Sequence, residues 1–229
     1  MRSRTRLGAA AAAAALVLAA AITGVAVATT VYSNNFASQA RFNEIVRSGG
    51  GKHCDHNYRA KSKTMHVSVH GGPATCSFRP PVQGDSELPD HIARVQGKIL
   101  KKTPSSARGG AFVEVDVRAG GGGMAYSLLV FPEKRKFELL RGPKGGGDFP
   151  VRGKSKAING INKPNVLQLS ATGAKLVATV NGKQVATATD DDPGQVTGRK
   201  VRFGVGTVKK SGKDVIAVIK RVSVAVPTP

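Results

Sequence analysis

The chain has 229 residues, with 35 Lys and Arg against 14 Asp and Glu, and a formal net charge of +21. This excess of positive charge predicts anionic partners, although it also keeps an exported protein soluble. Aromatic residues make up only 5% of the chain and no recognition motif is present, so nucleic acid is a disfavoured partner.

Residues 1–28 are predicted to be a signal peptide or a membrane anchor. Three arginines precede an Ala-rich apolar run over residues 7–31, and Ala26-Val27-Ala28 offers an A-x-A cleavage site. The run is also long enough, at roughly 20 residues, to span a bilayer as an uncleaved anchor. Both interpretations place the rest of the chain outside, either secreted or held at the membrane by this segment. Cleavage would leave 32 Lys and Arg against 14 Asp and Glu, a net charge of +18.

The segment 53–76 combines both cysteines of the chain with four of its five histidines. In an oxidising compartment an even pair of cysteines predicts a disulfide, Cys54–Cys76, which contributes on the order of 3 kcal/mol. A zinc site is the alternative, because Cys and His are ligands that Zn²⁺ prefers, although the spacing is not that of a zinc finger. The histidines are His53, His56, His66 and His70.

Short β-patterned runs separated by Gly, Pro, Asn and Asp predict an antiparallel sandwich or barrel over residues 29–226, followed by a tail at 227–229. Asn181-Gly182 predicts a type I′ hairpin turn, since both positions need a positive φ. Residues 64–70 fit an edge strand, and residues 88–102 fit a short helix or a strand. The remaining runs are 112–118, 126–131, 137–141, 165–171, 176–181, 183–189, 201–206 and 215–226. In the last run, apolar residues at alternate positions from Ile216 to Val226 are predicted to share one face, with Lys220 the exception.

The series FVEVDVR, YSLLVF, FELLR, NVLQLSATGAKLVATVNGKQV and GRKVRFGVG resembles the strands of concanavalin A-like lectins and glucanases. It is most similar to the laminin-G-like branch and to comparable bacterial extracellular modules. The resemblance is best supported over residues 112–226. It implies an all-β, antiparallel jelly-roll sandwich, whereas function has to be argued from the residues.

Glu114 and Asp116 lie two residues apart, so a β-strand places both on one face together with Arg118. Similarity to the glucanases implies the pattern E-x-D-x-(x)-E, in which the third carboxylate is missing here. A retaining hydrolase needs two carboxyl groups about 5 Å apart, one of them protonated, whereas a neighbouring arginine holds a carboxylate ionised. The chain also has no Trp to support a sugar ring. The favoured interpretation is a solvated strand face, and catalysis would need convergence of Glu138, Asp148 or Glu87.

The densest acidic cluster is Asp190-Asp191-Asp192, followed by Pro193-Gly194. The resemblance makes this cluster a candidate calcium site, because lectin-like sandwiches bind Ca²⁺ near their sheet edges with carboxylate and backbone oxygens. Turn chemistry alone also favours Asp, Pro and Gly in such a loop. Calcium therefore stays open, and no other cofactor is predicted.

Basic residues cluster at predicted loops that could gather at one end of a sandwich. The leading hypothesis is an exported, non-catalytic module that binds glycan or another anionic envelope polymer through these loops or through the concave sheet. A diverged glycoside hydrolase that uses Glu114 and Asp116 is the second hypothesis, and a structural or adhesion protein that binds another protein is the third. The candidate ligand-binding residues are Lys101, Lys102, Lys134, Arg135, Lys136, Arg152, Lys154, Lys209 and Lys210.

Overall fold

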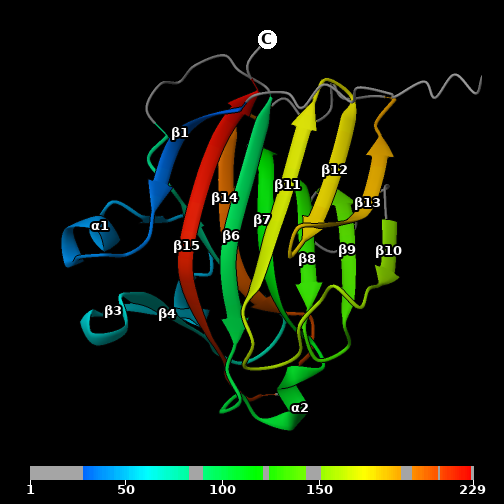
Figure 1. Ribbon diagram of the computed structural model, residues 1–229. Coiled ribbons are helices and arrows are strands. Elements are labelled where there is room, and N and C mark those ends of the chain that lie inside the picture. Colours follow the sequence, from blue (N-terminus) through cyan, green and yellow to red (C-terminus); the bar gives the residue numbers. More distant parts are fainter. Residues whose placement is uncertain are drawn as a thin grey trace, which may run out of the picture.

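The computed structural model shows two antiparallel sheets packed face to face (Figure 1). It describes residues 28–82, 90–120, 124–142, 151–191, 198–210 and 212–227. Sheet A has the order β13 (Lys183–Thr189), β12 (Lys175–Val180), β11 (Asn165–Thr172), β6 (His91–Ile99), β15 (Val215–Pro227), β4 (Thr64–Val69) and β3 (Cys54–Arg59), with β1 (Ala28–Asn34) also pairing with β15. Sheet B has the order β10 (Val151–Lys154), β9 (Lys136–Arg141), β8 (Tyr126–Phe131), β7 (Ala111–Ala119), β14 (Lys200–Thr207), β5 (Ala74–Arg79) and β2 (Val46–Arg47).

The described helices are short and lie outside the two sheets. They are α1 (Gln39–Asn43), α2 (Ser105–Arg108) and the 3₁₀ turns η1 (Gly51–His53) and η2 (Ala60–Ser62). None of the helices in the described part of the chain is long and apolar enough to cross a bilayer. The signal or anchor segment lies almost entirely outside the described residues and stays a prediction. Residues 28–34, which follow the predicted cleavage site or overlap the end of the apolar run, form β1 and pair with β15.

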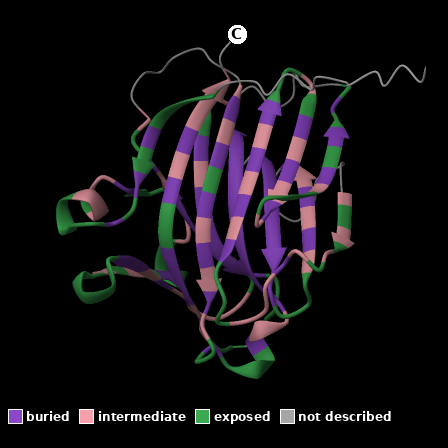
Figure 2. Ribbon diagram, viewed as in Figure 1, coloured by how far each residue is buried: buried purple, intermediate pink, exposed green. Residues whose placement is uncertain are grey.

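The hydrophobic core lies between the sheets and follows the period-2 pattern of the sequence. In β11, Leu167, Leu169 and Ala171 are fully buried while the residues between them are half exposed. The same alternation gives the strands of sheet A their banded colouring in Figure 2. Strands such as β11 and β6 thus contribute one apolar face to the core, and the predicted jelly-roll sandwich is confirmed.

Within the ambiguous segment 88–102, residues 91–99 form the central strand β6, because alternate residues such as Ala93 and Val95 face the core. A β-strand rather than a helix explains both the alternation in β6 and its pairing with β11 and β15.

The hairpin prediction is also confirmed: Asn181 and Gly182 join β12 to β13 with φ values of 51° and 77°.

One prediction about β15 is wrong, and a β-bulge is the reason. The register against β6 shifts between Ile219 and Arg221, so Lys220 is an extra residue in the strand. Before the bulge Val215, Ala217 and Ile219 face the core, and after it Val222 and Val224 do. The bulge therefore changes the face of the strand, which an uninterrupted period of two does not anticipate.

Candidate functional site

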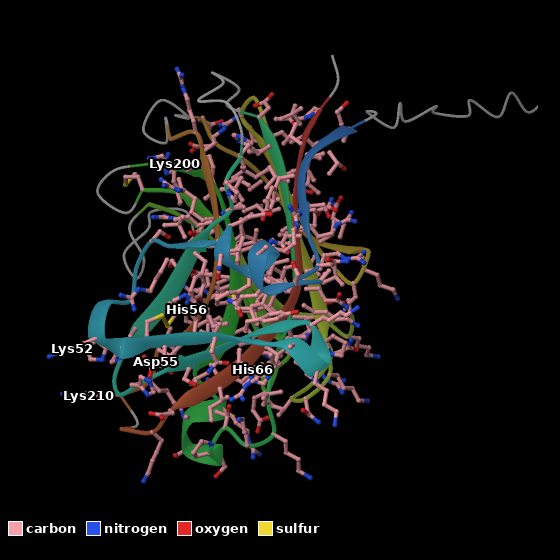
Figure 3. All side chains as sticks on the ribbon, turned by 90° about the vertical axis from the view of Figure 1, so that its left-hand side faces the viewer. Lys52, Asp55, His56, His66, Lys200 and Lys210 are labelled. Atoms are coloured by element: carbon pink, nitrogen blue, oxygen red, sulfur yellow. A yellow bond between two sulfur atoms is a disulfide. The ribbon has the colours of Figure 1, made fainter. Side chains whose placement is uncertain are left out.

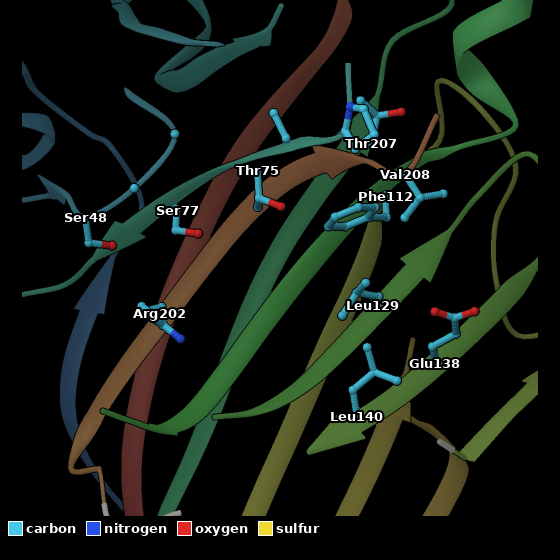
Figure 4. A pocket seen from close by; sticks show the side chains of 14 residues that line it. Ser48, Thr75, Ser77, Phe112, Leu129, Glu138, Leu140, Arg202, Thr207 and Val208 are labelled. Atoms are coloured by element: carbon cyan, nitrogen blue, oxygen red, sulfur yellow. The ribbon is translucent and has the colours of Figure 1, made fainter. Parts of the chain in front are cut away.

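A groove of about 680 Å³ crosses the outer face of sheet B (Figure 4). Its floor is apolar and includes Phe112, Leu129 and Leu140 from the adjacent strands β7, β8 and β9. Phe112, Leu129 and Phe131 form a small hydrophobic cluster outside the sandwich core, with the two phenyl rings 5.4 Å apart. Polar side chains complete the lining: Ser48, Thr75, Ser77, Glu138, Arg202 and Thr207.

The carboxylates of Glu114 and Asp116 lie beneath this groove and do not line it. Both side chains are on the outer face of β7, as the alternation predicts, but each is 0% exposed. The predicted solvated face is therefore wrong. Glu114 Oε1 accepts a hydrogen bond of 3.2 Å from the Ser77 hydroxyl, and Asp116 Oδ2 accepts one of 3.1 Å from Arg202 Nε. The groove presents Ser77 and Arg202, with the two carboxylates behind them.

Arg118 is not the partner of this pair, which corrects a second expectation. Its backbone φ is 51°, and the pairing of β7 with β14 shifts register beside it, between Lys200 and Arg202. The side chain instead reaches Asp90 Oδ1 at 2.8 Å and the carbonyl oxygen of Gly173 at 2.6 Å. The cation that neutralises Asp116 comes from β14, where sequence proximity gave no indication of it.

Two glycines on β14 make room for the buried carboxylate and the apolar floor. A Cβ at Gly204 would come within 2.7 Å of Glu114 Oε1, and a Cβ at Gly206 would come within 2.3 Å of the Phe112 ring. Glycine inside a strand marks such close approaches. The alternation Arg202, Gly204, Gly206 is the sequence signal that could have identified this face of β14 as part of a site.

Of the three carboxylates considered as a third catalytic group, Glu138 lines the groove, and Asp148 and Glu87 lie outside the described residues. Glu138 is opposite Leu129, which is opposite Glu114, so one whole strand separates the two glutamates. Two strand spacings place their backbones about 10 Å apart. Glu138 also forms an ion pair with Lys136.

The loops at the α2 end of the sandwich bring most of the predicted basic residues to one end of the molecule. Lys134 and Lys209 approach each other there, since a Cβ at Gly109 would be 3.4 Å from Lys209 Nζ and 3.6 Å from Lys134 Cε. Lys200, at the start of β14, is at the opposite end from Lys210, as Figure 3 shows. Arg152 lies within β10, paired with Glu138, and Lys136 begins β9. The residues at or next to the α2-end loops are Lys101, Lys102, Lys134, Arg135, Lys136, Lys154, Lys209 and Lys210.

The predicted disulfide Cys54–Cys76 is present and joins β3 of sheet A to β5 of sheet B, with a Cα–Cα distance of 5.3 Å. Its formation leaves no thiolate for the alternative zinc site. The described residues contain no group of three or more His, Cys, Asp or Glu side chains arranged to hold a metal ion. His56 packs against Phe78, and burial lowers its pKa.

Asp190, the first residue of the proposed calcium cluster, is buried in an internal network. Its Oδ2 accepts a hydrogen bond of 2.5 Å from the Tyr126 hydroxyl, and its Oδ1 pairs with Arg141 at 2.7 Å. Burial, and to a smaller extent this hydrogen bond, raises the pKa of Tyr126 to about 12. Asp191 is exposed and Asp192 lies outside the described residues, so the cluster does not converge on one point within the described part.

His70 bridges two carboxylates at the α2 end, with Nε2 2.9 Å from Asp55 Oδ2 and Nδ1 3.0 Å from Asp214 Oδ2. Two hydrogen bonds raise the pKa of the imidazole: the larger effect comes from Asp55 and the next from Asp214. Because the raised pKa belongs to the folded state, the stabilisation is complete below about pH 6.5 and is lost as the pH rises through the folded pKa.

We therefore expect His70→Gln to reduce the free energy of unfolding at pH 6, by less than about 1 kcal/mol because the pair is partly exposed. At pH 9 the same substitution should have a smaller effect, since the histidine is then neutral in both states. Urea unfolding of both proteins at the two pH values measures the difference. A larger loss at pH 9 than at pH 6 would contradict the assignment.

Comparison with known proteins gives matches to solved structures only: no protein-family model and no curated protein matches this chain. A Bacillus subtilis protein with a galectin-like fold has a TM-score of 0.56 at 14% identity, over 87% of this chain and 98% of that one. A prokaryotic β-1,3-1,4-glucanase (lichenase) from a mouse hindgut metagenome has a TM-score of 0.59 at 13% identity, over 87% and 100%. The carbohydrate binding module CBM66 from Bacillus subtilis has a TM-score of 0.53 at 14% identity, over 78% and 93%. The order and pairing of the strands, with these similarities, identify the fold of this chain as the concanavalin A-like jelly roll.

Proposed function

We propose that this protein is a non-catalytic glycan-binding module and that the groove on sheet B is its binding site. Among the structures that share its fold are a carbohydrate binding module and glucanases, which supports a carbohydrate ligand. Binding grooves for such ligands combine an apolar surface with a few polar groups that fix orientation. The floor formed by Phe112, Leu129 and Leu140, with hydroxyls on the opposite wall, has this combination.

The observation that carries the non-catalytic assignment is the burial of Glu114 and Asp116 behind Ser77 and Arg202. A glycosidase needs two carboxyl groups that flank the scissile bond, with separations of about 5–5.5 Å in retaining enzymes and 6.5–9.5 Å in inverting ones. Among the described lining residues Glu138 is the single carboxylate that faces the groove. One such group can bind a sugar hydroxyl, but it does not supply both an acid and a base.

Arg202 and the basic end favour a glycan that carries negative charge. The Arg202 side chain lines the groove, where 16% of it is exposed. Arginine suits a carboxylate or a sulfate because its donors form a planar fork. The lysines of the α2 end would add counterion release along a longer polymer and make the affinity sensitive to salt.

We expect Leu140→Ser to weaken glycan binding about tenfold, since a lost apolar contact of about 1.4 kcal/mol corresponds to that factor. Val177→Ser is the matched control, because Val177 is also half buried but lies on the outer face of sheet A. The measurement is binding of residues 29–229 to neutral and anionic polysaccharides across a salt titration, with EDTA in parallel to test calcium. Equal loss in both variants, or no binding to any polysaccharide, would refute the groove assignment.

The hydrolase alternative is favoured by the glucanases among the structural matches and by the position of Glu138. It predicts slow release of reducing ends that Glu138→Gln abolishes while binding persists. The protein-partner alternative has less support, because the exposed large apolar residues of the described part, Val31, Val46 and Val208, lie on three separate segments.

A further inference from the structure

A second cavity, of about 390 Å³, lies on the outer face of sheet A, on the other side of the sandwich from the groove. It is formed where β4, β15 and β6 run side by side (Figure 1). The pairing of Val218 with both His66 and Lys98 places these three residues in one row across the sheet. Val218 is the apolar floor, and a histidine and a lysine stand on either side of it. Figure 3 labels His66 on this part of the molecule.

The bulge in β15 gives the cavity its second lysine. Because Lys220 is the extra residue, the strand presents two successive cationic side chains, Lys220 and Arg221, at exposed positions. Lys220 lines the cavity together with Lys98. On the β4 side, the hydroxyls of Ser62 and Thr64 lie 2.7 Å apart and also line it.

No carboxylate of the described residues balances the positive charge of this cavity. No carboxylate lines it, and neither Lys98 nor Lys220 forms an ion pair with any described residue. The pKa of His66 is lowered, mainly by burial and to a smaller extent by the positive charges of Arg59, Lys102 and Lys98. Two lysine side chains that line one cavity, with two hydroxyls nearby, are a suitable environment for an oxyanion.

We propose that this cavity is an anion-binding site that takes the phosphate or sulfate ester group of a sugar between the ammonium groups of Lys98 and Lys220. The hydroxyls of Ser62 and Thr64 are hydrogen-bonded to each other, so together they can supply one further donor. The volume exceeds that of a bare oxyanion and falls within the range of small-ligand pockets, so Val218, Leu100 and Pro164 can contact the ring that carries the ester. The site does not depend on the groove, because it is built on the other sheet.

The test is an NMR titration of the His66 imidazole in the full chain at constant ionic strength. The probes are inorganic phosphate, inorganic sulfate, glucose 6-phosphate and glucose 6-sulfate, with chloride as the reference. Binding should shift the His66 signal and raise its pKa, since a nearby anion stabilises the imidazolium form. A sugar ester that binds more tightly than its inorganic ion supports contact with the carrier, and the relative affinities of phosphate and sulfate esters identify the group.

Lys98→Ala/Lys220→Ala should weaken binding of the sugar ester at least tenfold. Lys175→Ala/Lys183→Ala removes two exposed lysines from strands at the far edge of sheet A and should leave the affinity unchanged. A chloride reference that produces the same His66 shift, or equal losses in the two double variants, would overturn the proposal. Leu140→Ser should have no effect on this titration, so failure of the groove hypothesis and failure of this one are separable.

Discussion

Replacing Arg202 by Met is expected to reduce the free energy of unfolding by about 3–5 kcal/mol, the range for loss of one partner from a buried ion pair. The Asp116 carboxylate is 0% exposed, and the Nε–H of Arg202 is 3.1 Å from its Oδ2. Without the guanidinium a buried negative charge remains with no compensating cation. Urea unfolding at pH 7 measures the loss.

The reverse substitution, Asp116→Asn, should cost less, because the side chain of Arg202 is 16% exposed and faces the groove. The remaining cation can therefore be hydrated, whereas the remaining anion in Arg202→Met is enclosed. The double variant Arg202→Met/Asp116→Leu should recover much of the stability, since replacing a whole buried pair by apolar residues is often neutral. If Asp116→Asn destabilises more than Arg202→Met, the pair is not arranged as described.

This pair also shows why the fold could be predicted from the sequence and the site could not. The alternation in β7 and the N-G turn after β12 are local patterns, and each determined its element correctly. The environment of Glu114 and Asp116 depends on Ser77, Arg202 and Gly204, which come from strands 37 or more residues away in the chain. Period-2 reasoning separates two faces of a strand, but it does not say which face a neighbouring strand or loop will cover.

The β-bulges are a second reason why the orientation of some side chains could not be predicted from the sequence. Arg118 and Lys220 both lie at register shifts, and both were assigned to faces by strict alternation. At Arg118 the shift directs the side chain to Asp90 and Gly173, away from the carboxylates. At Lys220 it creates the exposed cation that lines the cavity on sheet A. A bulge is set by the pairing of two strands, so it has no strong signal in either sequence alone.

Removal of the disulfide is the second change that is expected to lower the free energy of unfolding strongly. Cys54→Ala/Cys76→Ala is expected to lose about 3 kcal/mol, because the two residues are 22 apart in the chain and closing a loop of that length lowers the entropy of the unfolded state by about this amount. Guanidinium unfolding of the variant, and of the wild type with and without reductant, measures the difference. The reduced wild type should match the variant within the error of the method. An unchanged midpoint in both would mean that the bond does not constrain the unfolded chain.

The position of the bond predicts where its loss acts first. Cys54 and Cys76 join the edge strand β3 to β5, and Gly50, which lines the groove, packs so closely that a Cβ there would lie 2.6 Å from Cys54 Cβ. Ser77, which donates to Glu114, directly follows Cys76. Hydrogen exchange should therefore increase in β3, in residues 48–51 and at the start of β5 before it increases in β11 or β12, which are separated from β3 by at least three strands of sheet A. Glycan affinity should fall together with this protection, because one wall of the groove is held by the same link between the sheets.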